Sequence, residues 1–221
     1  MKALVRRIEY PGKQIWLKAR KGKIGGSDAA AVLGLNPYKT NEELWEEMLG
    51  LKKPKDISDK SYVEYGINAE PHIRALFALD HPEYKVEYYG DNMLLNDKYP
   101  FAHASLDGEL TEISTGRKGI FECKTTELFS SMSKEKWDGD NIPNNYYIQV
   151  LHYLMVTEYD FVELRAQIKS VWNKQIRLTT KDYHIERNEV EADIEILKTA
   201  ECKFMEHVRR RQRPALILPE I

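Results

Sequence analysis

Two periodicities of apolar residues alternate along the chain, and together they predict a mixed α/β fold. Apolar positions recur three or four residues apart in some segments and every second residue in others. The helical spacing covers residues 27–33, 41–50, 59–79, 144–156 and 190–211. The strand spacing covers residues 85–89, 102–110, 119–125, 161–172 and 175–187, with a turn expected at 173–174.

Three helix signals refine these boundaries. Ser27 stands before an apolar run that stops at a glycine, so we expect it near the N-cap of a short helix. Thr40 and Glu43 form a capping-box pattern that opens the next helix. Pro71 lies inside a longer helical stretch, and because proline lacks the amide hydrogen, we expect a break or kink near Glu70.

The strongest chemical signal is an acid in one strand pattern followed by a Glu-x-Lys string in the next. Asp107 precedes a turn-rich gap, and Glu122 and Lys124 follow it. Side chains alternate along a strand, so Glu122 and Lys124 share a face. A hairpin centred near residues 114 and 115 would place Asp107 opposite Glu122. Two carboxylates and an ammonium would then converge, which suits a hard divalent cation and a water that loses its proton.

The residues alone also allow a structural explanation for each signal. The acidic strings fit an exposed hairpin with a cross-strand charge pair, although the apolar neighbours of Glu122 indicate a buried strand. Glu70 is either a third carboxylate of the cluster or a solvent-facing helix residue. Gln149, on a tyrosine-lined helix face, either hydrogen-bonds a water or a phosphate or marks the margin of an amphipathic helix. Arg20 and Ser27 either bind a phosphate or form a basic stretch before an ordinary N-cap.

Composition narrows the class of protein without identifying it. The 221 residues are 42% hydrophobic and carry a formal net charge of −2, so any nucleic-acid surface must be local. Two cysteines are too few for a disulfide framework or for a four-cysteine metal site. The N-terminus is unlike a signal peptide, and no apolar run reaches membrane-spanning length. We therefore expect one domain, residues 1–221, in a reducing cytoplasm.

Several motifs in order resemble the YqaJ-type viral recombinase family, relatives of the phage lambda alkaline exonuclease within the PD-(D/E)xK nuclease superfamily. The resemblance extends from about residue 16 to residue 157. In order, the motifs are Arg20 ahead of residues 24–28 and 34–38, then residues 65–70, 104–108, 122–124 and 146–153. The resemblance implies an α/β fold with a restriction-endonuclease-like core, in which helices flank a central mixed sheet. It also favours the functional interpretation of Glu70, Gln149 and Ser27.

The resemblance implies an active site that holds two Mg²⁺ ions, for which Mn²⁺ substitutes. Asp107 and Glu122 would ligate the metal together with the backbone carbonyl of Cys123, and Glu70 would assist them. Lys124 would activate the attacking water. The remaining implied contacts involve water or DNA.

Four further residues supply those contacts. Gln149 would help to position the attacking water, and Arg20 and Ser27 would bind a 5′-phosphate. Lys39 is the candidate for a second basic contact with the phosphate. The chain after residue 157 matches the family poorly, so no subunit contacts are carried over from it.

The activity implied by the resemblance is Mg²⁺-dependent 5′→3′ digestion of linear double-stranded DNA, which leaves 3′ single-stranded overhangs. Relatives form ring-shaped homotrimers around DNA ends and work with a single-strand annealing protein, with no membrane involved. The expected setting is a phage or prophage protein in a bacterial host cytoplasm. Two alternatives stay open: an endonuclease or repair nuclease on the same core, and a non-catalytic subunit that binds DNA ends. A Cas4-like nuclease is disfavoured, because its iron–sulfur cluster needs four cysteines and the chain has two.

Overall fold

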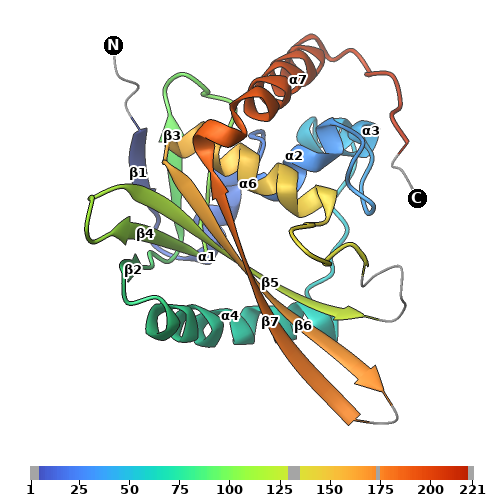
Figure 1. Ribbon diagram of the computed structural model, residues 1–221. Helices are drawn as coiled ribbons and strands as arrows, with labels where there is room; N and C mark the ends of the chain where they lie inside the picture. The colour runs from blue at the N-terminus through green and yellow to red at the C-terminus, as the bar shows by residue number, and fades with distance from the viewer. Residues whose placement is uncertain (1–4, 129–134, 173–174, 219–221) are drawn as a thin grey trace.

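The computed structural model describes residues 5–128, 135–172 and 175–218 (Figure 1). The α-helices are α1 (Lys13–Arg20), α2 (Gly26–Val32), α3 (Asn41–Met48), α4 (Ser61–Asp80), α6 (Asn144–Thr157) and α7 (Glu191–Arg210). The strands are β1 (Val5–Glu9), β2 (Tyr84–Glu87), β3 (Asn92–Asn96), β4 (Gly108–Glu112), β5 (Lys118–Leu128), β6 (Phe161–Trp172) and β7 (Gln175–Glu186). A 3₁₀ turn, Arg187–Glu189, joins β7 to α7.

A five-stranded mixed sheet forms the centre of the fold. Its strand order is β2-β4-β5-β6-β7; β5 and β6 run parallel, whereas the other neighbours run antiparallel. A parallel pair needs a crossover connection, and α6 lies within that connection. Helix α4 covers one face of the sheet, and α2, α6 and α7 lie on the other side (Figure 1). The predicted α/β class, with helices flanking a central mixed sheet, is confirmed.

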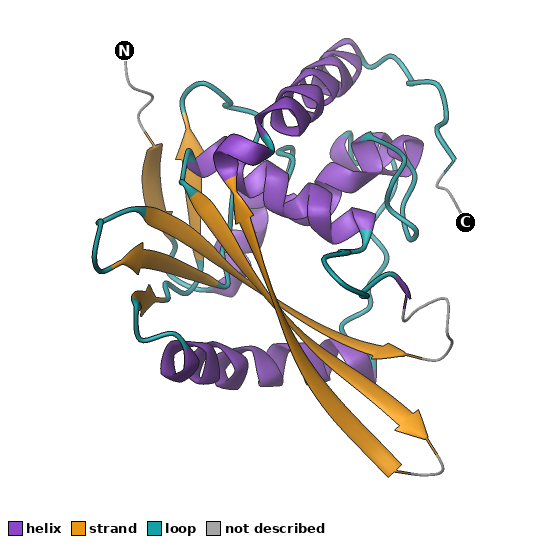
Figure 2. Ribbon diagram, viewed as in Figure 1, coloured by secondary structure: helices purple, strands orange, loops and turns teal. Residues whose placement is uncertain are grey.

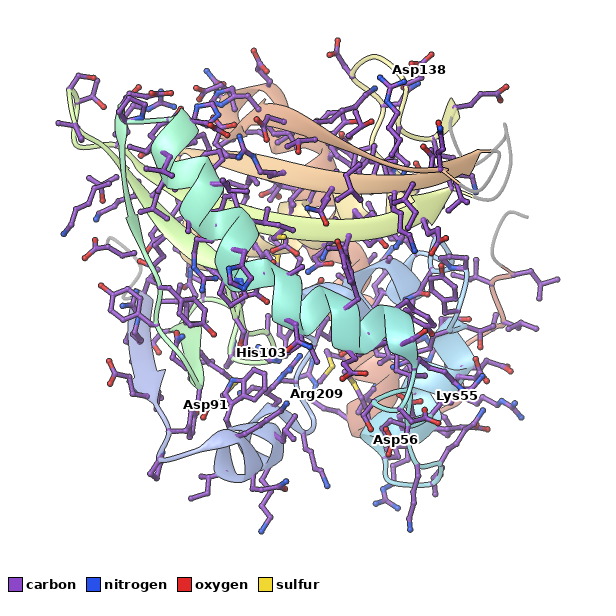
Figure 3. All side chains as sticks on the ribbon, turned by 90° about the horizontal axis from the view of Figure 1, so that it is seen from below. Lys55, Asp56, Asp91, His103, Asp138 and Arg209 are labelled. Atoms are coloured by element: carbon purple, nitrogen blue, oxygen red, sulfur yellow. The ribbon has the colours of Figure 1, made fainter. Side chains whose placement is uncertain are left out.

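Alternating side chains along β5 divide the apolar core between the two faces of the sheet. Phe121 and Cys123 pack with Ile73 and Phe77 in the cluster under α4. Ile120 belongs to the larger cluster on the other side, which includes residues of α2, α6 and α7. The next even-numbered side chains of β5 therefore turn toward α6. Helix α4 crosses the strands on this face of the sheet (Figure 3).

Strands β6 and β7 form a long hairpin that extends beyond the rest of the sheet (Figure 2). They pair antiparallel along their whole length, from Phe161 opposite Glu186 to Trp172 opposite Gln175. The turn predicted at residues 173–174 lies outside the described residues. Strands β1 and β3 pair with each other in a separate two-stranded sheet.

Some local expectations are wrong. Helix α4 continues through Pro71, so the chain does not break near Glu70; the alternative, a kink at that point, stays a prediction. Pro71 lies on an exposed side of the helix, where the carbonyl that has lost its helical partner can bond water. The N-cap of α2 is Gly25 rather than Ser27, because the glycine pair lets the helix begin earlier. The pattern expected to be a strand at residues 102–110 becomes regular only at Gly108.

Three short elements have no counterpart in the sequence-based expectations. Strands β1 and β3 and helix α1 are at most eight residues long and mix polar or charged positions with apolar ones, so neither period stands out. Among residues 5–128, 135–172 and 175–218, none of the helices combines the length and the apolar character that crossing a membrane requires.

Candidate active site

The hairpin between β4 and β5 brings Asp107 and Glu122 together. Gly108 pairs with Phe121, so Asp107, one residue earlier, lies opposite Glu122. This is the register that the sequence predicts. Oδ2 of Asp107 accepts a hydrogen bond from the backbone N–H of Cys123 at 2.9 Å. That bond fixes the Asp107 carboxylate beside β5.

Glu122 is the most deeply buried charged group of the site, with 1% of the residue exposed. Its Oε1 accepts hydrogen bonds from Lys124 Nζ and from Gln149 Nε2, the latter at 2.8 Å. Its Oε2 is buried and has no hydrogen-bond partner within the described part of the chain. A buried carboxylate oxygen without a partner is unfavourable unless another group binds it.

Helix α6 supplies the amide that reaches Glu122. Tyr146, Gln149 and Tyr153 share one face of α6, as their spacing predicts. Gln149 Nε2 also donates to the hydroxyl of Tyr153 at 3.0 Å, which holds the amide in place. The Nζ of Lys124 lies 5.0 Å from the centre of the Tyr146 ring, within cation–π distance. The two tyrosines therefore lie on either side of the glutamine along the helix.

A close contact between α2 and α6 fixes the position of this helix face. A Cβ atom at Gly26 would lie 2.5 Å from Cε1 of Tyr153 and 2.9 Å from Cγ of Gln149. Both distances are too short for real atoms, so the two helices can approach this closely only with glycine at position 26. The start of α2 is thereby placed beside the residue that contacts Glu122.

Glu70 approaches the carboxylate pair from α4 but is turned toward Arg74. Nη1 of Arg74 donates to Oε1 of Glu70 at 2.9 Å and to the backbone carbonyl of Asp107 at 2.6 Å. Burial and the charge of Asp107 raise the pKa of Glu70, and Arg74 opposes that shift. Sequence reasoning missed Arg74, although its position four residues after Glu70 places both side chains on one helix face.

Burial makes both central carboxyl groups difficult to ionise, and at Glu122 the charge of Asp107 adds to the effect. Burial and the charge of Asp107 raise the pKa of Glu122 to about 8. Burial also raises the pKa of Asp107, although Lys124 and the backbone N–H of Cys123 oppose the shift. Burial disfavours the charge on Lys124, but the two carboxylates outweigh it and raise the pKa of Lys124. The lysine therefore stays an ammonium, beside a carboxyl pair that one cation alone does not fully stabilise.

Two of the predicted phosphate-binding residues lie near the start of α2. Ser27 is exposed in the first turn, and no side chain caps this helix, so its hydroxyl is not used in capping. Arg20 is the last residue of α1, and its Nη2 would lie 3.5 Å from a Cβ atom at Gly25. The Arg20 guanidinium also lies over the Trp16 ring, 4.5 Å from its centre. The structure therefore brings Arg20 close to the turn that contains Ser27.

Lys39, the third predicted phosphate contact, is engaged elsewhere. Its Nζ bonds Oδ1 of Asp28 at 3.1 Å and Oε2 of Glu47 at 2.7 Å. Burial disfavours its charge, but these two carboxylates outweigh the effect and raise the pKa of Lys39. Two of the three N–H groups of Lys39 are therefore already used, and its charge is shared with two carboxylates.

The donor set of the site suits a cation that takes few protein ligands. Within the described residues, no group of three or more His, Cys, Asp or Glu side chains is arranged to hold a metal ion. Mg²⁺, however, is commonly bound by one or two carboxylates, with water and substrate phosphate oxygens as its other ligands. Asp107 and Glu122 meet that requirement, and the unpartnered Oε2 of Glu122 is the atom that a cation would satisfy. Glu70, turned toward Arg74, lies outside this pair.

Residues 15–160 match the family described as the YqaJ-like viral recombinase domain. "Uncharacterized protein YqaJ" of Bacillus subtilis (strain 168) is 35% identical to the chain over 164 residues. The alignment covers 72% of this chain and 48% of that relative. The chain therefore spans about half the length of the curated relative that it matches.

Solved structures share the fold at low sequence identity. An alkaline exonuclease from Laribacter hongkongensis superposes with a TM-score of 0.61 and 18% identity, covering 91% of this chain and 97% of that chain. The same exonuclease in complex with dAMP gives a TM-score of 0.59 and 19% identity over the same shares. A phage-related exonuclease from Haemophilus somnus 129PT gives 0.55 and 14%, covering 86% of this chain and 96% of that one. At these identities the likeness establishes a common fold.

Proposed function

The chain belongs to the YqaJ-like viral recombinase family, and we propose that it is a nuclease that acts on DNA. The finer proposal is a Mg²⁺-dependent 5′→3′ exonuclease that digests linear double-stranded DNA and leaves 3′ single-stranded overhangs. The observation that carries it is the pairing of half-buried Asp107 with buried Glu122, which contacts Lys124 and has one carboxylate oxygen unpartnered within the described residues. Structural neighbours described as exonucleases support the same reaction class.

The metal-binding part of the proposal rests on three groups of the β4–β5 hairpin. Asp107, Glu122 and the backbone carbonyl of Cys123 would hold two Mg²⁺ ions, or Mn²⁺ in their place, with Glu70 assisting. When bound, the metal would supply positive charge for the attacking and leaving oxygens and lower the pKa of a water. The unpartnered Oε2 of Glu122 supports this assignment.

Lys124 and Gln149 would act on the attacking water. Because Lys124 stays protonated beside Glu122, it serves as a donor that orients the water and stabilises negative charge on it, rather than as a base. Gln149 uses Nε2 on Glu122 and Tyr153, which leaves its amide oxygen to accept a hydrogen bond from the water. Both side chains are held by buried partners, so they would need little reorganisation before cleavage.

End recognition is assigned to Arg20 and Ser27. The exposed Ser27 hydroxyl and the nearby Arg20 guanidinium offer a donor and a cation to a 5′-phosphate. Lys39 is a weaker candidate because it is already paired with two carboxylates. Replacing Arg20 or Ser27 by alanine should reduce the preference for 5′-phosphorylated ends more than it reduces metal binding.

The assembly proposed for this function is a homotrimeric ring around the DNA end, with a single-strand annealing protein as partner. The near-neutral charge motivates the ring, since enclosing the DNA reduces the need for a strongly basic surface. We propose that a phage or prophage gene encodes the protein and that it acts in the cytoplasm of the bacterial host. Loss of processivity at dilutions that preserve the trimer would count against enclosure.

The test is digestion of a linear duplex in Mg²⁺, with one strand labelled at its 3′ end. Ends with 5′-phosphate are compared with 5′-hydroxyl ends, and linear DNA is compared with a closed circle. We expect the labelled strand to shorten from its 5′ end in linear DNA only, fastest from phosphorylated ends. Cleavage of the closed circle would indicate an endonuclease instead. If neither Mg²⁺ nor Mn²⁺ supports cleavage, the protein would instead be a non-catalytic subunit that binds DNA ends.

A further inference from the structure

A groove of about 700 Å³ opens beside the carboxylate site. Its walls come from the loop before α3, the end of β5 and the start of α6. Its lining includes the side chains of Tyr38, Trp137, Ile142 and Tyr146. Within the described residues, aromatic and apolar side chains make up about half of the lining, and polar and charged side chains make up the rest.

Two tyrosines give this groove flat faces that a planar ligand can contact. Tyr38 is 85% exposed, so its ring is accessible to a ligand. Tyr146 is half-buried and rests against the buried Trp137, with ring centroids 5.6 Å apart. Tyr146 is therefore held by a buried neighbour, whereas the Tyr38 ring is largely exposed.

The groove adjoins the catalytic groups directly. The Tyr146 ring that lines it lies 5.0 Å from Nζ of Lys124. Tyr146 also stands one helical turn before Gln149 on the same face of α6, a rise of roughly 5 Å. A molecule that places a phosphate at the carboxylate pair would therefore bring its neighbouring ring to this groove.

The charges around the groove are balanced among the described residues. Glu127 and Glu135 line it, against Lys136 among the lining residues. The nearby Lys169 is already paired with Glu127 at 3.2 Å. With Glu127 paired and Glu135 balanced by Lys136, these described residues offer a phosphodiester chain no net attraction, whereas an uncharged nucleobase can stack on the aromatic rings.

We propose that this groove binds an unpaired nucleobase of the strand being cut, stacked on Tyr38 and Tyr146. The proposal rests on the nuclease function and names a subsite for it. The start of α2, with Ser27, adjoins α6 at Tyr153, whereas the groove lies at the Tyr146 end. The base therefore belongs to the nucleotide on the 3′ side of the scissile phosphate, opposite the 5′-phosphate. Stacking there would hold the strand in register when the terminal base pairs have opened.

The test measures binding of short duplexes with an unpaired 5′ end, using Ca²⁺ in place of Mg²⁺ to suppress cleavage. One duplex carries an abasic nucleotide at the second position, and a control duplex carries it at the sixth. We expect the second-position change to weaken binding by the full-length protein roughly 5- to 100-fold. The sixth-position change should have little effect.

Tyr38→Ala and Tyr38→Phe then assign the effect to the ring. Tyr38 is largely exposed, so the alanine variant should fold. We expect Tyr38→Ala to bind the intact duplex weakly, with the affinity that the normal protein has for the second-position abasic duplex. The abasic nucleotide should not weaken binding by Tyr38→Ala any further. Tyr38→Phe should behave like the normal protein. An unchanged response to the abasic nucleotide in Tyr38→Ala would overturn the subsite.

The activity of the normal protein separates this proposal from the function on which it rests. If the normal protein digests linear duplex in Mg²⁺ but binds both abasic duplexes equally, the nucleobase subsite is wrong and the nuclease assignment stands. If the normal protein cuts no DNA, the nuclease assignment fails, and the subsite fails with it.

Discussion

Replacing Gly26 by alanine tests the helix contact that positions Gln149. In an isolated helix, alanine is more favourable than glycine by about 1 kcal/mol, so Gly26→Ala would stabilise a loosely packed α2. In the structure, the added Cβ would lie 2.5 Å from one ring carbon of Tyr153 and 2.6 Å from another. Ordinary contacts of this kind lie between 3.4 and 4 Å, so α2 and α6 would have to separate by about 1 Å.

The magnitude follows from these two opposing effects. Overpacking of a buried contact costs about 1–3 kcal/mol, and the helix preference for alanine returns up to about 1 kcal/mol. We therefore expect Gly26→Ala to lower the free energy of unfolding by about 1–2 kcal/mol. Because α6 also carries Gln149, a shift of about 1 Å should reduce the cleavage rate by up to roughly 100-fold.

Urea denaturation and DNA digestion measure the two effects, with Gly90→Ala as the matched control. A Cβ atom at Gly90 would meet nothing within 4 Å, so that variant should leave stability and cleavage nearly unchanged. If Gly26→Ala proved at least as stable as the normal protein, α2 and α6 would not approach each other as described. The reasoning on how Gln149 is positioned would then fail as well.

Three further predictions concern buried charges. Lys124→Ala should reduce cleavage by roughly 100- to 10,000-fold while DNA-end binding persists, and a complete loss of binding in a filter assay would reject its role toward water. Burial and Asp107 raise the pKa of Glu122 to about 8, so the metal-free folded state holds a proton there that the unfolded chain releases above about pH 4.3. The stability of the metal-free protein should therefore fall between about pH 4.3 and pH 8, and Glu122→Gln should flatten that fall; an equally steep fall in the variant would contradict the assignment. Glu201→Gln should lower the free energy of unfolding by about 3–5 kcal/mol near pH 6, because it leaves the fully buried, charged His152 without its carboxylate. Burial disfavours the charge on His152, but Glu201 outweighs that effect and raises the pKa of His152. The stability lost in Glu201→Gln should therefore shrink as the pH rises above about 6.5 and the histidine loses its proton. A loss of stability that does not change with pH would show that the histidine is neutral.

The sequence predicts those parts of the fold that follow from local periodicity. The expected helix at residues 144–156 is α6, and the expected strands at residues 161–172 and 175–187 are β6 and β7 within a residue. The register of Asp107 against Glu122 also follows from the sequence, because a short turn fixes which residues of a hairpin face each other. Local rules suffice for these elements.

Contacts between distant segments are beyond such rules. Nothing in the local sequence indicates that Gly26 packs against α6, or that Arg74 bonds the carbonyl of Asp107. His152 and Glu201 are 49 residues apart and meet only because α7 packs on α6. At α2, the N-cap is Gly25, two residues before the serine that capping rules favour.

The most direct test of the account compares DNA digestion by the normal protein and by Glu122→Gln in Mg²⁺ at pH 8. Glutamine keeps the size of the side chain and removes the charge that would hold the metal, so both proteins should be folded in circular dichroism. The account predicts that the normal protein shortens a linear duplex and that the variant is slower by at least roughly 1,000-fold. Equal digestion by the two proteins would contradict the claim that the buried carboxyl pair is the active site.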